Sequence, residues 1–73
     1  MNDREWDINY WIRYKLKNIL YCAKRGNKYC ARVNADELQG MLLYMQSVGD
    51  ISEDVYNKVW NLNNLLVAKY SLY

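Results

Sequence analysis

The chain has 73 residues, 52% of them hydrophobic and 25% charged, with a formal net charge of +2. A chain of this length folds as one domain with a small core, and its hydrophobic content excludes intrinsic disorder. It contains no His and only two Cys, which form no CxxC pair. The usual zinc and redox motifs are therefore excluded, and we expect no metal and no cofactor.

The first predicted element is a long helix over residues 3–25, because the chain has no Pro and its first Gly is Gly26. Acidic residues occupy the early turns and basic residues the last turn, as the helix dipole prefers. Gly26 or Asn27 can take the left-handed conformation that ends a helix. One aliphatic stripe of this helix is predicted to join the core: Ile8, Ile12, Leu16, Ile19 and Ala23.

The opposite side of this helix combines aromatic and basic side chains and should face solvent in a simple bundle. Aromatic rings offer stacking surfaces, while Lys and Arg meet phosphates. This face therefore predicts binding of an anionic small molecule of nucleotide-like chemistry. Helical spacing aligns six residues on it, with Arg13 and Arg25 beside them: Trp6, Tyr10, Tyr14, Lys17, Tyr21 and Lys24.

The segment after this helix is strongly basic, since residues 8–35 carry seven Lys or Arg and no acid. Residues 28–33 are predicted as an ordered loop that continues the basic and aromatic surface. The backbone of residues 25–27 is predicted to expose N–H groups as an anion-binding nest. The complete predicted ligand site is Tyr10, Tyr14, Lys17, Tyr21, Lys24, Arg25, Lys28 and Arg32.

The second and third predicted helices cover residues 35–48 and 52–70. Asn34 is expected to cap the second helix, with Glu37 reaching back to it, and Ser52 to cap the third. The short turn between them predicts an antiparallel hairpin on which the long first helix docks, giving a small all-α three-helix domain. The predicted core of the hairpin is Leu38, Met41, Leu42, Met45, Val48, Ile51, Val55, Val59, Leu62 and Leu66, with a second apolar stripe at Tyr56, Trp60 and Val67.

Two other functions remain open for these surfaces. Tyr and Trp dominate the energetics of protein interfaces, so the aromatic residues also predict a homo-oligomer or the docking of a host protein. Nucleic acid is the third candidate partner, through the first helix and the segment that follows it. The candidate interface residues are Trp6, Trp11, Tyr56 and Trp60.

Catalysis is not expected, because the chain lacks a His base and its carboxylates lie in the opening turns of helices. Lys24 or Arg25 could lower the pKa of a Cys22 or Cys30 thiol, but such a nucleophile would still lack a base. The polar start of the chain and the absence of a long apolar run predict a cytoplasmic protein with reduced thiols.

The composition as a whole is rich in Asn and Tyr and lacks Pro, Phe and His. It resembles that of small accessory proteins of phages and mobile elements from AT-rich genomes. The resemblance implies a stoichiometric binder with a counter-defence role, acting on a host protein or a signalling nucleotide.

Overall fold

The protein folds into three helices, α1 (Asp3–Lys24), α2 (Lys28–Ser47) and α3 (Glu53–Lys69). This computed structural model describes the backbone of residues 3–73 and the side chains from Asp7 onward. No strand occurs in that backbone, and the predicted all-α three-helix class is confirmed. None of the helices in the described part of the chain is long and apolar enough to cross a membrane.

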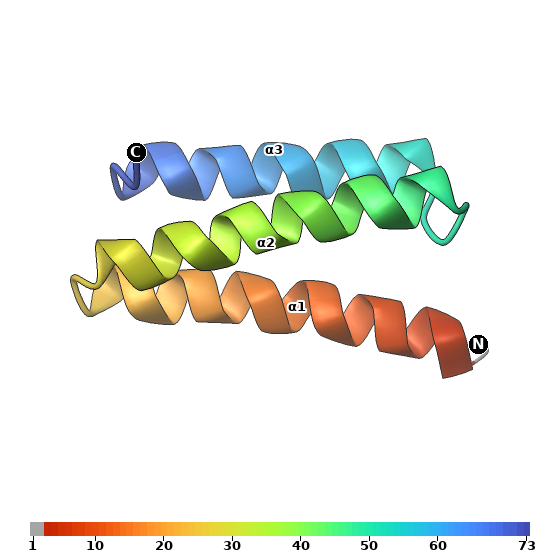
Figure 1. Cartoon of the computed structure of the whole chain (residues 1–73), viewed down its shortest axis with the longest axis horizontal. Coiled ribbons are helices and arrows are strands. Elements are labelled where there is room, and N and C mark those ends of the chain that lie inside the picture. The colour runs from red at the N-terminus through yellow and green to blue at the C-terminus, as the bar shows by residue number, and fades with distance from the viewer. Residues whose placement is uncertain (1–2) are drawn as a thin grey trace.

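The three helices run up, down and up, with α2 between the other two (Figure 1). α1 packs mainly on α2, α3 also packs on α2, and α1 and α3 touch each other only slightly. The molecule measures 37 × 19 × 15 Å along its principal axes. The start of α1 and the α2–α3 turn share one end, while the α1–α2 turn and the C-terminus share the other (Figure 1).

The core is built mostly by α2, which is the only helix packed on both sides. Its Leu38 and Leu42, both predicted core residues, are fully buried. The aliphatic stripe of α1 also joins the core as predicted, through Ile12 and Ile19. Among the side chains that the structure describes, the buried apolar residues are Ile12, Ile19, Ala31, Ala35, Leu38, Leu42, Leu66 and Leu72.

The predicted core is wrong at three positions of the α2–α3 hairpin. Val48 is 50% exposed, Val55 37% and Leu62 43%. The cause on α3 lies in the rotation of this helix about its own axis, because Asn63 faces the core while Val55 and Leu62 are turned towards solvent. The two apolar stripes of α3 therefore lie on either side of Asn63.

Asn63 is fully buried and ties α3 to α2. Its Nδ2 donates a hydrogen bond to the carbonyl oxygen of Ala35 at 3.1 Å. Its Oδ1 is buried and accepts no hydrogen bond from any described residue. Since an unsatisfied buried acceptor is costly, this contact fixes the pairing of the two helices at some expense of stability.

The second helix begins seven residues earlier than predicted, and the prediction of a loop over residues 28–33 is wrong. Asn27 is the N-cap, and its side-chain oxygen accepts a hydrogen bond from the N–H of Cys30 at 3.0 Å. Asn34 lies inside the helix and donates back to the carbonyl oxygen of Cys30 at 2.9 Å. Glu37 forms an ion pair with Lys15 of α1 instead of closing a capping box.

All three helices end in the same hydrogen-bond pattern. At the end of α1, the N–H of Asn27 donates to the carbonyl of Cys22 at 2.9 Å, and that of Gly26 to Ala23 at 3.0 Å. Equivalent pairs of bonds close α2 and α3. The residue at the left-handed position of this Schellman motif is glycine in α1 and α2 and serine in α3: Gly26, Gly49 and Ser71, with φ of 78°, 79° and 52°.

The start of α3 follows the sequence prediction. Ser52 adopts an extended conformation, and its Oγ accepts a hydrogen bond from the N–H of Val55 at 3.2 Å. Glu53 and Asp54 follow in the first turn, beside the positive end of the helix dipole. The predicted N-cap of the third helix is therefore confirmed.

Candidate functional site

The outward side of α1 carries five aligned residues, which we call the α1 outer face: Tyr10, Tyr14, Lys17, Tyr21 and Lys24. All five are exposed, the tyrosines by 47%, 43% and 61% in chain order. At a rise of about 1.5 Å per residue, the face extends for about 21 Å along the helix. Trp6 was predicted to belong here, but its side chain lies outside the described residues.

Three rings of α1 pack against one another near the start of the α1 outer face. The rings of Tyr10 and Tyr14 are stacked, with centroids 6.2 Å apart. Trp11 meets them edge-on, at 5.6 Å from Tyr10 and 5.5 Å from Tyr14. Because Trp11 is itself 48% exposed, the cluster presents aromatic surface to solvent in a fixed arrangement.

Tyr21 and Arg25 form a second, polar unit at the other end of the face. The Nη1 of Arg25 donates a hydrogen bond to the hydroxyl oxygen of Tyr21 at 2.5 Å. The guanidinium carbon lies 5.0 Å from the centroid of the Tyr21 ring. This contact holds Arg25 in place while leaving most of its N–H donors available to an anion.

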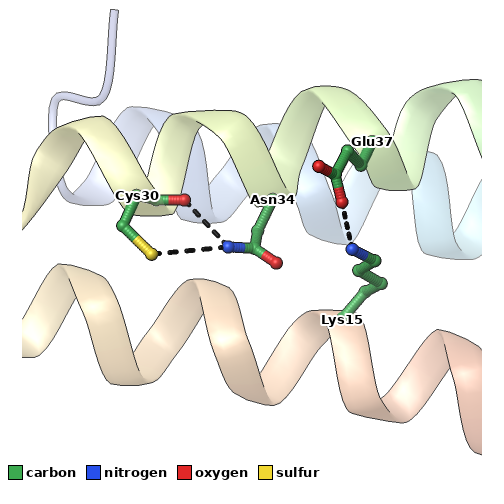
Figure 2. A network of polar contacts seen from close by, with 4 residues as sticks. All are labelled: Lys15, Cys30, Asn34 and Glu37. Atoms are coloured by element: carbon green, nitrogen blue, oxygen red, sulfur yellow. Dashed lines mark hydrogen bonds and ion pairs between the residues drawn. The ribbon is translucent and has the colours of Figure 1, made fainter.

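Positive charge on this side of the protein is largely uncompensated. Among residues 7–73, the only ion pair is that of Lys15 with Glu37, which links α1 to α2 (Figure 2). The basic residues of the predicted site are therefore not neutralised by carboxylates among the described side chains and can interact with a partner. Within the described side chains, eight exposed basic residues lack a carboxylate partner: Arg13, Lys17, Lys24, Arg25, Lys28, Arg32, Lys58 and Lys69.

The helical conformation of residues 28–34 moves two predicted site residues away from the α1 outer face. The flank of α2 that faces α1 carries Cys30, Asn34 and Glu37 (Figure 2). Lys28 and Arg32 instead share a helical ridge with Asp36, which accepts a hydrogen bond from the Tyr73 hydroxyl of the C-terminal segment. The structure therefore separates Lys28 and Arg32 from the tyrosines and lysines of α1.

The predicted anion-binding nest at residues 25–27 does not form. Gly26 is left-handed as predicted, but all three N–H groups donate to carbonyl oxygens of α1. Their donor–acceptor distances are 3.3 Å for Arg25, 3.0 Å for Gly26 and 2.9 Å for Asn27. These groups end the helix and cannot also hold an anion.

The two thiols lie together where α1 turns into α2, and both are free. The pKa of Cys22 is raised above its usual value, chiefly by a hydrogen bond with Cys30 and then by burial, against an opposing effect of Arg25. The predicted lowering by a basic neighbour is therefore wrong for Cys22, which stays a neutral thiol at neutral pH. No group of three or more Cys, Asp or Glu able to hold a metal occurs among the described residues.

Tyr56 and Trp60 of α3, two predicted interface residues, are used within the molecule. Their rings stack with centroids 5.3 Å apart and an interplanar angle of 25°. Both side chains are half-buried and pack against the hydrophobic core. Much of their surface is therefore already covered by the chain itself.

Comparison with known proteins finds no match: no family model fits the chain, and no curated protein or solved structure is similar to it.

Proposed function

We propose that this chain is a non-enzymatic binding protein whose α1 outer face holds a nucleotide-containing anion. The observation that carries the proposal is the alignment of exposed rings and exposed cations on one helix face. Lys17 follows the packed rings of Tyr10, Trp11 and Tyr14, and Tyr21 lies between Lys17 and Lys24. Bases can stack on the rings while each lysine neutralises a phosphate.

The shape of the face favours a chain of nucleotides over a single nucleotide. Sites for small molecules are concave and bury most of the ligand, whereas the outer side of a helix is convex. The α1 outer face is also long, at about 21 Å. Single-stranded nucleic acid, which combines a line of phosphates with bases free to stack, matches both properties.

Each residue type has a distinct role in this proposal. The stacked pair of Tyr10 and Tyr14 supplies ring surface whose orientation is already set, so little side-chain entropy is lost on binding. Lys17 and Lys24 supply point charges, and Arg25 supplies a planar donor group held against Tyr21. Sequence selectivity is not expected, because every base has a face that can stack.

A host protein remains a second candidate partner, and the ring cluster favours it. Tyr10, Trp11 and Tyr14 pack as a unit and still expose roughly half of each side chain. Clusters of this kind anchor protein interfaces. A counter-defence protein that blocks a host factor would use the same rings with less dependence on the lysines.

The affinity for a fluorescent oligothymidine strand, measured by anisotropy at low salt, tests the proposal. Replacing Lys17 and Lys24 by Glu together should weaken binding by more than about tenfold, because two charge-assisted contacts become repulsive. The matched control replaces Lys28 and Arg32 by Glu, the same change of net charge on the far flank of α2, and should weaken binding only a few-fold.

Two results would count against the proposal. A natural chain that binds no strand at low salt is not a nucleic-acid binder. Equal losses in the two double variants would mean that net charge, and not the α1 outer face, determines the affinity. Both variants change exposed side chains only, so circular dichroism should show an unchanged helix content.

A further inference from the structure

Exposed large aliphatic side chains are confined to the second half of the described chain. Leu43, Val48, Val55, Leu62 and Leu65 are the large aliphatic residues most open to solvent, and all belong to α2, α3 or the α2–α3 turn. In the described part of α1, the exposed large hydrophobic residues are all aromatic instead: Tyr10, Trp11, Tyr14 and Tyr21. The two outer helices therefore present different chemistry, and the aliphatic part has no role in the proposed function.

On α3 these aliphatic residues form a continuous ridge with charged ones. Leu65 is 67% exposed and was not predicted as a surface anchor, because the sequence pattern placed the neighbouring stripe in the core. Successive members are spaced by three or four residues, which is one helix face. The residues of this α3 ridge are Asp54, Lys58, Leu62, Leu65 and Lys69, with Val55 beside them.

The α3 ridge carries opposite charges at its two ends, so two antiparallel copies of it are electrostatically complementary. Asp54 stands in the first turn and Lys69 in the last, and neither has an ion-pair partner among the described residues. Asp54 lies eight residues before Leu62 and Lys69 seven residues after it. Two antiparallel copies of the ridge that cross at Leu62 therefore bring each Asp54 close to Lys69 of the other copy.

We propose that the α3 ridge is a self-association surface on which a second copy of this chain packs antiparallel, about a two-fold axis near Leu62. The two copies cover each other's Leu62 and Leu65, and the charges at the ends of the ridge fix the antiparallel direction. This inference does not rest on the proposed function. α1 and α3 flank α2 on different sides (Figure 1). We therefore expect the α1 outer face to stay open in the dimer.

The association should be weak and dependent on concentration. One helix of 17 residues from each copy gives an interface at the small end of the range for specific complexes. We expect the average mass in sedimentation equilibrium to rise from 8.8 kDa towards twice that value between about 1 µM and about 1 mM.

A pair of matched substitutions on α3 locates the surface. Leu62→Lys should weaken the dimer by at least about tenfold, because it places two like charges at the two-fold axis. Asn57→Lys makes the same addition of charge at an exposed position on another face of α3 and should leave the dimer unchanged within about twofold. A dimer that survives Leu62→Lys, or a chain that stays at 8.8 kDa throughout, overturns the proposal.

Cysteine crosslinking tests the direction of packing, in a background where Cys22 and Cys30 are replaced by Ser. A mixture of Asp54→Cys and Lys69→Cys chains should form a mixed disulfide dimer under mild oxidation. Lys69→Cys alone should not crosslink, because the two copies of residue 69 are about 20 Å apart in the antiparallel arrangement. Crosslinking of Lys69→Cys alone, without the mixed product, indicates parallel packing and contradicts the proposal.

Discussion

At residue 71 a serine occupies the backbone conformation that glycine occupies at the ends of the other two helices. Its φ of 52° is the only positive value at a non-glycine residue in the described chain. The Cβ of Ser71 crowds the backbone in this conformation, and the following residue, Leu72, is buried in the core. The last turn of α3 therefore stores strain to place Leu72.

Ser71→Gly should relieve this strain and raise the free energy of unfolding by about 0.5–1 kcal/mol. Urea unfolding followed by circular dichroism measures the change. Ser47→Gly is the matched control, because Ser47 ends α2 without a positive φ, and it should lower the free energy of unfolding. A neutral or destabilising Ser71→Gly would show that position 71 is not strained.

Inside the core, the Nδ2 of Asn63 donates a hydrogen bond to Ala35, whereas its Oδ1 accepts none from the described residues. Ala35 lies within α2, so its carbonyl also accepts the helical N–H and does not depend on Asn63. Asn63→Leu should therefore keep the free energy of unfolding within about 1 kcal/mol of the natural chain. Asn63→Asp should lower it by about 3 kcal/mol or more at neutral pH, because it buries a charge beside a carbonyl oxygen.

The pH dependence of these two variants provides the check. The carboxyl of Asn63→Asp should have a raised pKa in the fold, so its loss of stability should shrink as the pH falls and the group is protonated. Asn63→Leu should show no such trend. An Asn63→Asp chain that unfolds like the natural one at every pH would mean that position 63 is reached by water.

The raised pKa of Cys22 also has a pH consequence. The pKa of Cys22 in the folded chain exceeds the unfolded value of 9.0, so the protonated thiol contributes to the stability of the fold. This contribution is fully present below pH 9.0 and is lost as the pH rises through the folded pKa. Cys30→Ala removes the main cause, and the pKa of Cys22 should fall. Peptide-resolved alkylation with iodoacetamide against pH should then show a midpoint for Cys22 at lower pH than in the natural chain; an unmoved midpoint contradicts the assignment.

At the scale of the elements, the start of α2 was the main failure of the sequence prediction. Asn27 and Asn34 both have a side chain that can cap a helix, and local sequence does not distinguish them. Tertiary packing selects Asn27 as the cap, because a helix that includes residues 28–34 buries Ala31 and brings Cys30 towards α1 (Figure 2). Long-range contact of this kind is invisible to helical periodicity.

Asn27→Ala should lower the free energy of unfolding by about 1 kcal/mol, because it removes the acceptor for the N–H of Cys30. Asn57→Ala, at an exposed position inside α3, is the control and should change stability by less than about 0.5 kcal/mol. Thermal or urea unfolding compares the two. Equal effects would indicate that α2 does not depend on its cap at Asn27.

The elements that the sequence did predict are those whose signals are local. The end of the first helix at Gly26, the Ser52 cap and the aliphatic stripe of α1 all follow from spacing and turn chemistry. The rotation of α3 could not be predicted in this way, because a buried Asn interrupts the apolar pattern on which helical periodicity depends. The α3 ridge is exposed for the same reason.

At the scale of the whole molecule, the candidate site was predicted in part. The exposure of the tyrosines and lysines of α1 follows from the amphipathic pattern of one helix and was correct. The placement of Lys28 and Arg32 depended on the conformation of residues 28–33, and the prediction of a loop there was wrong. The structure leaves two outer helices with separate proposed roles, α1 for a nucleotide chain and α3 for a second copy.

The measurement that tests the central claim most directly is the salt dependence of binding to single-stranded oligothymidine. For the natural chain the logarithm of the association constant should fall linearly with the logarithm of salt concentration. Replacing Lys17 and Lys24 by neutral Gln should reduce the slope by about 1.4, since each phosphate contact to a single strand contributes about 0.7. An unchanged slope, or binding that does not respond to salt, would contradict phosphate recognition by the α1 outer face.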